Sequence, residues 1–150
     1  MDYKRDNSPI AAIPPVALEN AFDRQRSELP EDAEVLDRLF RYIETTRPLM
    51  AEIKAAVCEF YHMDASLLEG RQRVQETALA RQVFYFLCYR YTRFSSLQIG
   101  RFIGRDHATV LHGLRKIEGL LLTHQLLADD IDLLRLRISE KMLLRKASQC

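Results

Sequence analysis

The stretch that decides the fold comprises residues 104–117 and reads GRDHATVLHGLRKI. Asp106 lies where a helix would begin, and its carboxylate can accept a hydrogen bond from an unpaired amide of the first turn. Apolar residues then follow at spacings of four, three and four, on one helix face: Val110, Leu114, Ile117 and Leu121. Polar residues lie largely outside that face: His107, Thr109, His112 and Lys116. A helix that is apolar on one side and carries hydrogen-bonding groups on the other suits the major groove of DNA.

The residues just upstream predict a partner helix and a tight turn. Ser95 and Gln98 have the spacing of a capping box, in which each side chain bonds the other residue's main chain. A short helix over residues 97–103 would then end at Gly104, a residue suited to a left-handed backbone. A short helix, a glycine turn and a longer second helix together indicate a helix-turn-helix motif.

A long helix is predicted over residues 76–93, which contain no Gly or Pro. Its apolar face would comprise Ala80, Phe84, Leu87 and Tyr91, and its solvent-accessible residues would include Arg81, Gln82 and Arg90. The aromatic run from Phe84 to Phe86 could stack on the bases of a single strand. At helical spacing such residues more often form the core, and we favour that interpretation.

Residues from about 48 to 122 resemble the C-terminal duplex-DNA-binding domain of the bacterial replication initiator family DnaA. The resemblance rests on Arg81-Gln82, on residues 96–100 (SLQIG) and on residues 105–112 (RDHATVLH), which are similar to the family signature GRDHTTVLHA. It implies an all-α helix-turn-helix domain of the Trp-repressor-like type. In this family the second helix of the motif enters the major groove, and a basic loop ahead of the long helix reaches the minor groove.

The resemblance also implies roles for individual residues. Arg73, with Arg71 close by, matches the minor-groove arginine, and Arg81 with Gln82 matches a pair near the phosphates. Residues 106–109 match the base-reading start of the recognition helix, and His112 matches a later position in the groove. The complete set of predicted DNA-binding residues is Arg71, Arg73, Arg81, Gln82, Ser95, Arg105, Asp106, His107, Ala108, Thr109, His112 and Lys116.

Three differences from the family pattern affect the predicted interface. Ala108 replaces a threonine, so a methyl that can touch a thymine methyl stands where a hydroxyl could hydrogen-bond. The turn is one residue shorter, because Gly104-Arg105 replaces the common Gly-Gly-Arg. Gly113 replaces the signature's last alanine, which lowers helix propensity by about 1 kcal/mol but permits a close approach.

The charge is concentrated in the region of these motifs. The whole chain of 150 residues has a net charge of only +1, yet residues 71–117 contain nine Lys or Arg against Glu76 and Asp106. A basic region confined to the motif is typical of nucleic-acid binding. The hydrophobic content of 47% is sufficient for a single domain with a real core.

Other classes of function find little support in the sequence. No glycine begins a G-x-x-x-x-G-K-[ST] phosphate loop, so neither nucleotide hydrolysis nor a cofactor is expected. Cys58 and His62 have a spacing that could chelate a metal, but no further ligand pair lies nearby, and no metal site is expected. Three widely spaced cysteines imply no disulfide framework. With no secretory signal or membrane span, we expect a protein of the bacterial cytoplasm, on the nucleoid.

We expect four sections: a flexible arm over residues 1–17, a helical extension over 18–47, the DNA-binding domain over 48–122 and a C-terminal helix over 123–150. Within the extensions, helices are predicted over residues 30–45 and 126–146. Their apolar stripes could complete the domain's own core, which we favour, or pair between chains in a homodimer. The apolar arm could dock on a protein partner or fold back on its own domain.

The leading hypothesis is a regulator that occupies initiator-type boxes on double-stranded DNA, blocking replication initiation or controlling transcription without an ATPase. One alternative is a helical protein-interaction module with a vestigial DNA surface. Another is an origin-binding factor of a mobile element that recruits a separate motor.

Overall fold

In a computed structural model, residues 32–71 and 75–149 are described, and they form helices without any strand. The helices are α2 (Ala33–Thr46), α3 (Met50–Phe60), α4 (Ala65–Glu69), α5 (Gln75–Tyr91), α6 (Ser96–Phe102), α7 (His107–Leu121) and α8 (Gln125–Ser148). The predicted all-α fold is therefore confirmed. The predicted arm over residues 1–17 and the minor-groove residue Arg73 lie outside the described residues.

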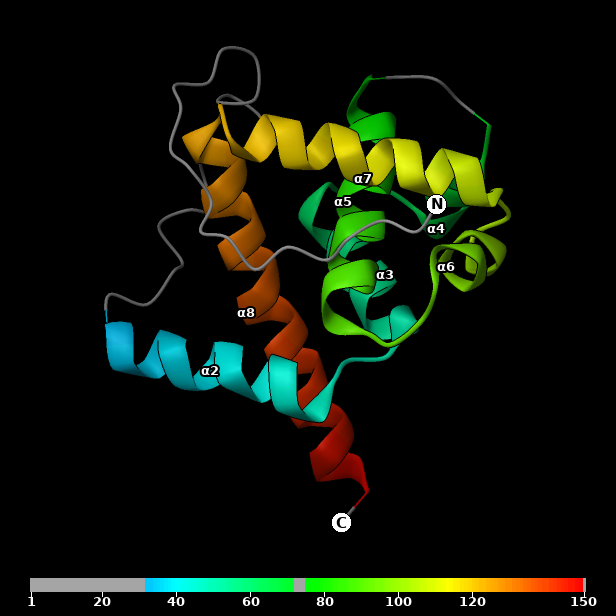
Figure 1. The fold of residues 1–150 in the computed structure, drawn as a ribbon. Helices are drawn as coiled ribbons and strands as arrows, with labels where there is room; N and C mark the ends of the chain where they lie inside the picture. The colour runs from blue at the N-terminus through cyan, green and yellow to red at the C-terminus, as the bar shows by residue number, and fades with distance from the viewer. Residues whose placement is uncertain (1–31, 72–74, 150) are drawn as a thin grey trace.

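The helix-turn-helix pair is held on the long helix α5 (Figure 1). The motif's second helix, α7, lies across α5, and α6 packs against both. Gly113 allows the close crossing, because a Cβ atom there would lie only 2.7 Å from Cδ2 of the buried Tyr85 ring. The expectation that Gly113 permits a close approach is confirmed.

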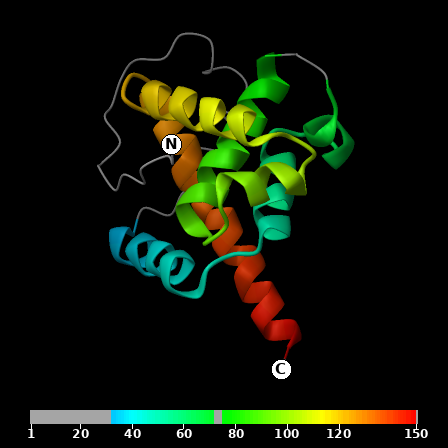
Figure 2. The ribbon, with the colours of Figure 1, turned by 45° about the vertical axis from the view of Figure 1, so that its right-hand side comes forward.

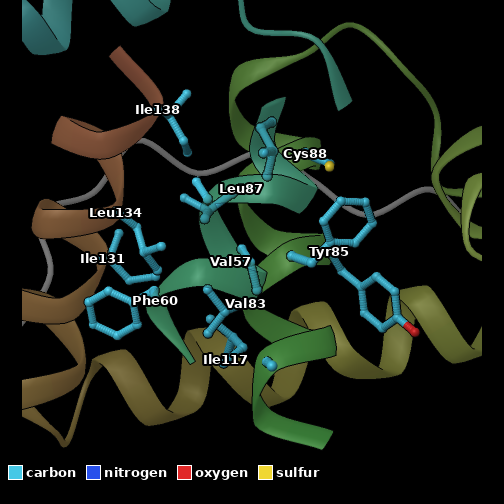
Figure 3. Packing of buried hydrophobic residues seen from close by; sticks show 14 of the residues in the cluster. Val57, Phe60, Val83, Tyr85, Leu87, Cys88, Ile117, Ile131, Leu134 and Ile138 are labelled. Carbon is cyan, nitrogen blue, oxygen red and sulfur yellow. The ribbon is translucent and has the colours of Figure 1, made fainter. Parts of the chain in front are cut away.

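One hydrophobic core joins α3, α5, α7 and α8 (Figure 3). Phe60 lies beside Ile131 and Leu134 of α8, and Val83 and Ile117 belong to the same cluster; Phe60, Val83 and Ile117 are fully buried. The predicted stripe of α8 is buried as a whole: Leu127, Ile131, Leu134 and Ile138. Since each such side chain stabilises the fold by about 1.5–3 kcal/mol on burial, α8 is a structural part of the domain core. This favours the interpretation that the apolar stripe of the C-terminal helix completes the domain's own core.

Ion pairs and a cation–π contact fasten the outer helices. Lys141 of α8 lies 2.7 Å from Glu59 of α3, and Arg145 lies 2.9 Å from Glu52. The Arg135 guanidinium lies 3.6 Å from the centre of the Phe40 ring on α2. In Figure 2 the last turns of α8 project beyond α2 towards the C-terminus. Among the described helices, none is long and apolar enough to cross a membrane.

The N-terminal helix begins later than predicted. Asp32 is its N-cap, and its carboxylate accepts hydrogen bonds from the amides of Glu34 (2.9 Å) and Val35 (3.3 Å). The sequence pattern placed the start at Pro30, because proline suits a first turn. A capping carboxylate that satisfies two unpaired amides instead fixes the start at Ala33.

Candidate nucleic-acid interface

The turn between α6 and α7 is tight, and local chemistry dictates it. The predicted capping box at the start of α6 is confirmed: Ser95 Oγ accepts from the Gln98 amide at 3.2 Å, and Gln98 Oε1 accepts from the Ser95 amide at 2.9 Å. The predicted left-handed residue is confirmed as well, since Gly104 has a φ of 73°. That conformation strains residues with a Cβ but not glycine. The main chain therefore turns sharply between the end of α6 and the cap of α7.

The start of α7 is fixed by the predicted cap. Asp106 is the N-cap residue, and its carboxylate accepts a hydrogen bond from the Thr109 amide at 2.7 Å. Hydrogen bonds from the Thr109 side chain, and then from its amide, lower the pKa of the Asp106 carboxyl. The carboxylate is therefore charged at neutral pH and stabilises the positive end of the helix dipole.

The outward side of α7 is polar and exposed. Val110, Leu114 and Ile117 are buried, as predicted. The exposed residues of α7 include Ala108, Thr109, His112, Arg115 and Lys116. Sequence reasoning did not single out Arg115, although it follows Ala108 by seven residues and so shares its face. The helical repeat alone could have identified it.

His107 is held in place by a contact that sequence reasoning missed. Its Nδ1 lies 2.7 Å from the hydroxyl oxygen of Ser96, with which it shares a hydrogen bond. Ser96 is buried and His107 is half-buried, so the first residue of α7 is tied to the first residue of α6. Two residues eleven positions apart are paired here by the turn, and no local pattern indicates such a pair.

Arg81 does not have the predicted environment. The expectation that it is available to solvent is wrong, because its side chain is only 8% exposed. Its Nε donates to the carbonyl oxygen of Leu68 at 2.7 Å, and one terminal nitrogen donates to the carbonyl oxygens of Leu67 (3.0 Å) and Gly70. The last carbonyls of a helix have no partner within it and carry partial negative charge, so the end of α4 attracts this cation inward. Gln82, the next residue, is half-exposed.

A second guanidinium reaches the same main-chain oxygen. Arg105, in the turn before α7, donates to the carbonyl oxygen of Glu69 at 3.1 Å and to that of Gly70. Burial, and then the nearby Arg105, lower the pKa of Arg81. Arg71, one residue beyond Gly70, is exposed. Among the predicted site residues, Ala108, Thr109, His112 and Lys116 are thus exposed on α7, whereas Arg81 and Arg105 both bond the end of α4.

The aromatic residues of α5 belong to the interior. Phe84 and Tyr85 are 0% and 2% exposed, and Phe86 is partly buried against the core. The interpretation of this run as core is therefore confirmed, and Phe84 and Tyr85 have no surface on which a base could stack.

Comparison with known proteins identifies the helix-turn-helix region. Residues 50–117 match the family described as bacterial dnaA protein helix-turn-helix. The chromosomal replication initiator protein DnaA of Cereibacter sphaeroides is 46% identical over 85 residues, 56% of this chain and 19% of that protein. That of Bartonella quintana is 39% identical over 109 residues, 72% of this chain and 22% of that protein. The DnaA of Bacteroides thetaiotaomicron is 39% identical over 79 residues.

The chain spans about a fifth of the length of these curated relatives. The match includes α3 to α6 and most of α7, with the basic region, the capped turn and the outward polar face of α7. Residues 50–117 therefore match the helix-turn-helix domain of bacterial DnaA, and this similarity supports DNA binding.

Proposed function

We propose that this protein recognises short, asymmetric, A·T-containing boxes on double-stranded DNA, similar to those implied for the DnaA family. The observation that carries the proposal is the outward face of α7, where Thr109, His112 and Lys116 are exposed while the opposite face is buried. A helix held in this way can present its side chains to the major groove without reorganising.

Base reading is assigned to the first turns of α7. Thr109 and His112 supply hydrogen-bonding groups, and Ala108 supplies a methyl for contact with a thymine methyl. Asp106 and His107 fix how α7 begins, through the Thr109 amide and through Ser96. The order of reading groups along the helix then sets the order of preferred base pairs.

Phosphate contacts are assigned to residues around that face. Lys116 and Arg115 are exposed on α7, Gln82 is half-exposed on α5, and Ser95 caps α6. Such contacts set the register of the protein on the duplex without reading sequence. Arg73, with Arg71 beside it, is assigned to the minor groove on the resemblance to the family, because narrow A·T-rich grooves attract guanidinium groups.

At the level of the cell, we propose a regulator on the bacterial chromosome. By occupying initiator-type boxes it would compete with the initiator or control nearby transcription, and no phosphate-loop motif lies within the 150 residues to support hydrolysis of a nucleotide. An origin-binding factor of a mobile element would read DNA in the same way. The two roles differ in which boxes the protein occupies in the cell.

We also propose a homodimer. Its interface would include the exposed apolar residues at the C-terminal end of α8. Leu143 and Leu144 are 44% and 71% exposed on the projecting end of this helix. A dimer would present two reading helices and would require paired boxes at a fixed spacing. Sedimentation equilibrium of the pure protein, with and without a two-box duplex, measures this directly.

The first experiment is binding of the pure protein to a family-type box and to a scrambled duplex at two salt concentrations. A sequence-specific reader prefers the box, and with about five to seven phosphate contacts log K falls with log salt at a slope of about −5 to −6. Equal, salt-sensitive binding to both duplexes would indicate a general DNA binder. Absence of binding to either would overturn the proposal in favour of a protein-interaction module.

A further inference from the structure

Two arginine side chains from distant parts of the chain converge on the end of α4. We name this arrangement the Gly70 clamp: Arg81 and Arg105, with the main-chain carbonyl groups of residues 67–70. Arg81 donates to three of these carbonyls, and Arg105 donates to those of Glu69 and Gly70. Since both guanidinium groups bond the same Gly70 oxygen, α4 is joined to α5 and to the turn before α7 at one point.

The main chain of Arg105 is anchored as firmly as its side chain. Its amide donates to the Gly100 carbonyl oxygen at 2.7 Å. A Cβ atom on Gly100 would lie 2.4 Å from the Arg105 carbonyl oxygen, so only glycine fits this contact. Arg105 therefore connects α6, through its main chain, to α4, through its side chain, one residue before the cap of α7.

The clamp also lies between the two predicted DNA-reading elements. Gly70 immediately precedes Arg71 of the predicted minor-groove loop, which spans residues 69–75, and Arg105 immediately precedes Asp106, the N-cap of α7. A Cβ atom on Gly70 would lie 2.9 Å from the Ser66 carbonyl oxygen, so a side chain at this position would crowd the end of α4. The start of the loop and the N-cap of α7 are thus held relative to each other.

We propose that Arg105 is a positioning residue, which sets the orientation of α7 relative to the end of α4, and not a direct DNA contact as its place in the predicted DNA-binding set implies. A guanidinium can donate several hydrogen bonds in one plane and so bridge neighbouring carbonyl groups, whereas an ammonium is a single point charge. The proposal rests on the proposed DNA-binding function, because the orientation of α7 matters only if α7 meets DNA.

The decisive variant is Arg105→Lys, which keeps the charge but removes the planar set of donors. A phosphate contact tolerates lysine, so binding would then change little. Loss of the clamp instead lowers box affinity by about tenfold, since charged hydrogen bonds are lost and the reading groups are displaced. Because the charge remains, the salt slope is unchanged, and the preference for the box over a scrambled duplex decreases.

The matched control is Arg101→Lys, an equally conservative change at an exposed arginine of the neighbouring helix α6. Its box affinity is expected to remain within about twofold of the wild type. Arg105→Ala completes the series. If it lowers the salt slope by about one and Arg105→Lys restores both slope and affinity, Arg105 is a phosphate contact and the proposal is overturned.

Hydrogen exchange of the free protein tests the clamp without DNA. In Arg105→Lys, amides of residues 67–71 and 104–107 should exchange about tenfold faster, while those in the middle of α8 keep their protection. Unchanged exchange in both segments would overturn the proposal. If the wild-type protein binds no duplex, the proposed function fails, but this measurement still decides whether the clamp exists. A thermal melt of each variant verifies that it is folded.

Discussion

Helices α5 and α7 cross each other, and both carry cationic residues beside their apolar stripes, yet the structure places these residues in opposite ways. Arg81 of α5 points inward and bonds the end of α4, whereas Lys116 of α7 is exposed. The difference arises because α5 is covered by α3, α4, α6 and α7, while α7 has one side in solvent. Helical periodicity identifies a polar face reliably only where a helix has solvent on that side.

The largest expected effect comes from removing the inward cation. Arg81→Met should lower the free energy of unfolding by about 2–4 kcal/mol, because carbonyl groups at the end of α4 lose their donors in a buried site. Urea unfolding monitored by circular dichroism measures this. The matched change on the outward side, Lys116→Met, should leave stability within about 0.5 kcal/mol and reduce the salt slope of DNA binding by about one. Equal unfolding midpoints for the two variants would remove the contrast between α5 and α7.

The crossing point of the two helices gives the next effect. Gly113→Ala places a methyl 2.7 Å from the Tyr85 ring, which is buried and has little freedom to yield, so we expect a loss of about 1–3 kcal/mol. Gly119→Ala is the matched control on α7. No atom lies within 4 Å of the added methyl, and better helix propensity should raise stability by about 0.5–1 kcal/mol. Thermal denaturation of both variants should therefore move the midpoint in opposite directions, and a parallel shift would contradict the close crossing.

Variants in the segment ahead of α5 and at the start of α7 should alter base preference at different positions of the box. Arg73→Ala should cost roughly 1–3 kcal/mol of binding and relax base choice at the minor-groove positions of the box. Thr109→Ala should relax base choice at major-groove positions instead. Binding to a panel of single-base variants of the box maps both effects. If Arg73→Ala binds specific and random duplexes as the wild type does, the assignment of this loop is wrong.

The smallest effect concerns the two helix caps of the motif, one of which can titrate. The pKa of Asp106 is lowered in the folded protein, so its stabilising effect is present above the unfolded value near 3.8 and is lost as the pH falls through the lower folded value. Ser95 caps α6 without any such dependence. Asp106→Asn retains a capping oxygen, so the variant should keep the free energy of unfolding at pH 7. It should lose the decrease in stability that protonation of Asp106 causes in acid. Unfolding curves measured between pH 2 and pH 7 should converge for the two proteins at neutral pH, and an unchanged acid dependence would assign the effect to other carboxyl groups.

Much of the fold could be predicted because its signals are local. Helix caps act within three residues, as at Ser95 and Asp106, and Gly104 allows the turn through its own backbone freedom. The stripe of α8 followed from spacing alone, and its four predicted residues are buried. The start of α2 was wrong by three residues, because proline and aspartate both suit a helix N-terminus and their competition is decided by hydrogen bonds to the amides.

The candidate site likewise has features set by local sequence and features set by tertiary contacts. The sequence by itself determined the helix-turn-helix, the outward residues of α7 and the concentration of positive charge, since these depend on helical period and composition. Only the tertiary structure decided that Arg81 is buried, that Arg105 bonds the end of α4 and that Ser96 holds His107. Each of these contacts joins residues between eleven and thirty-six positions apart, through carbonyl groups and side chains that carry no sequence pattern of their own. The physical reason is that a guanidinium can donate its hydrogen bonds either to water or to the unpaired carbonyl groups at a helix end. The packing of the helices decides which of these acceptors it contacts.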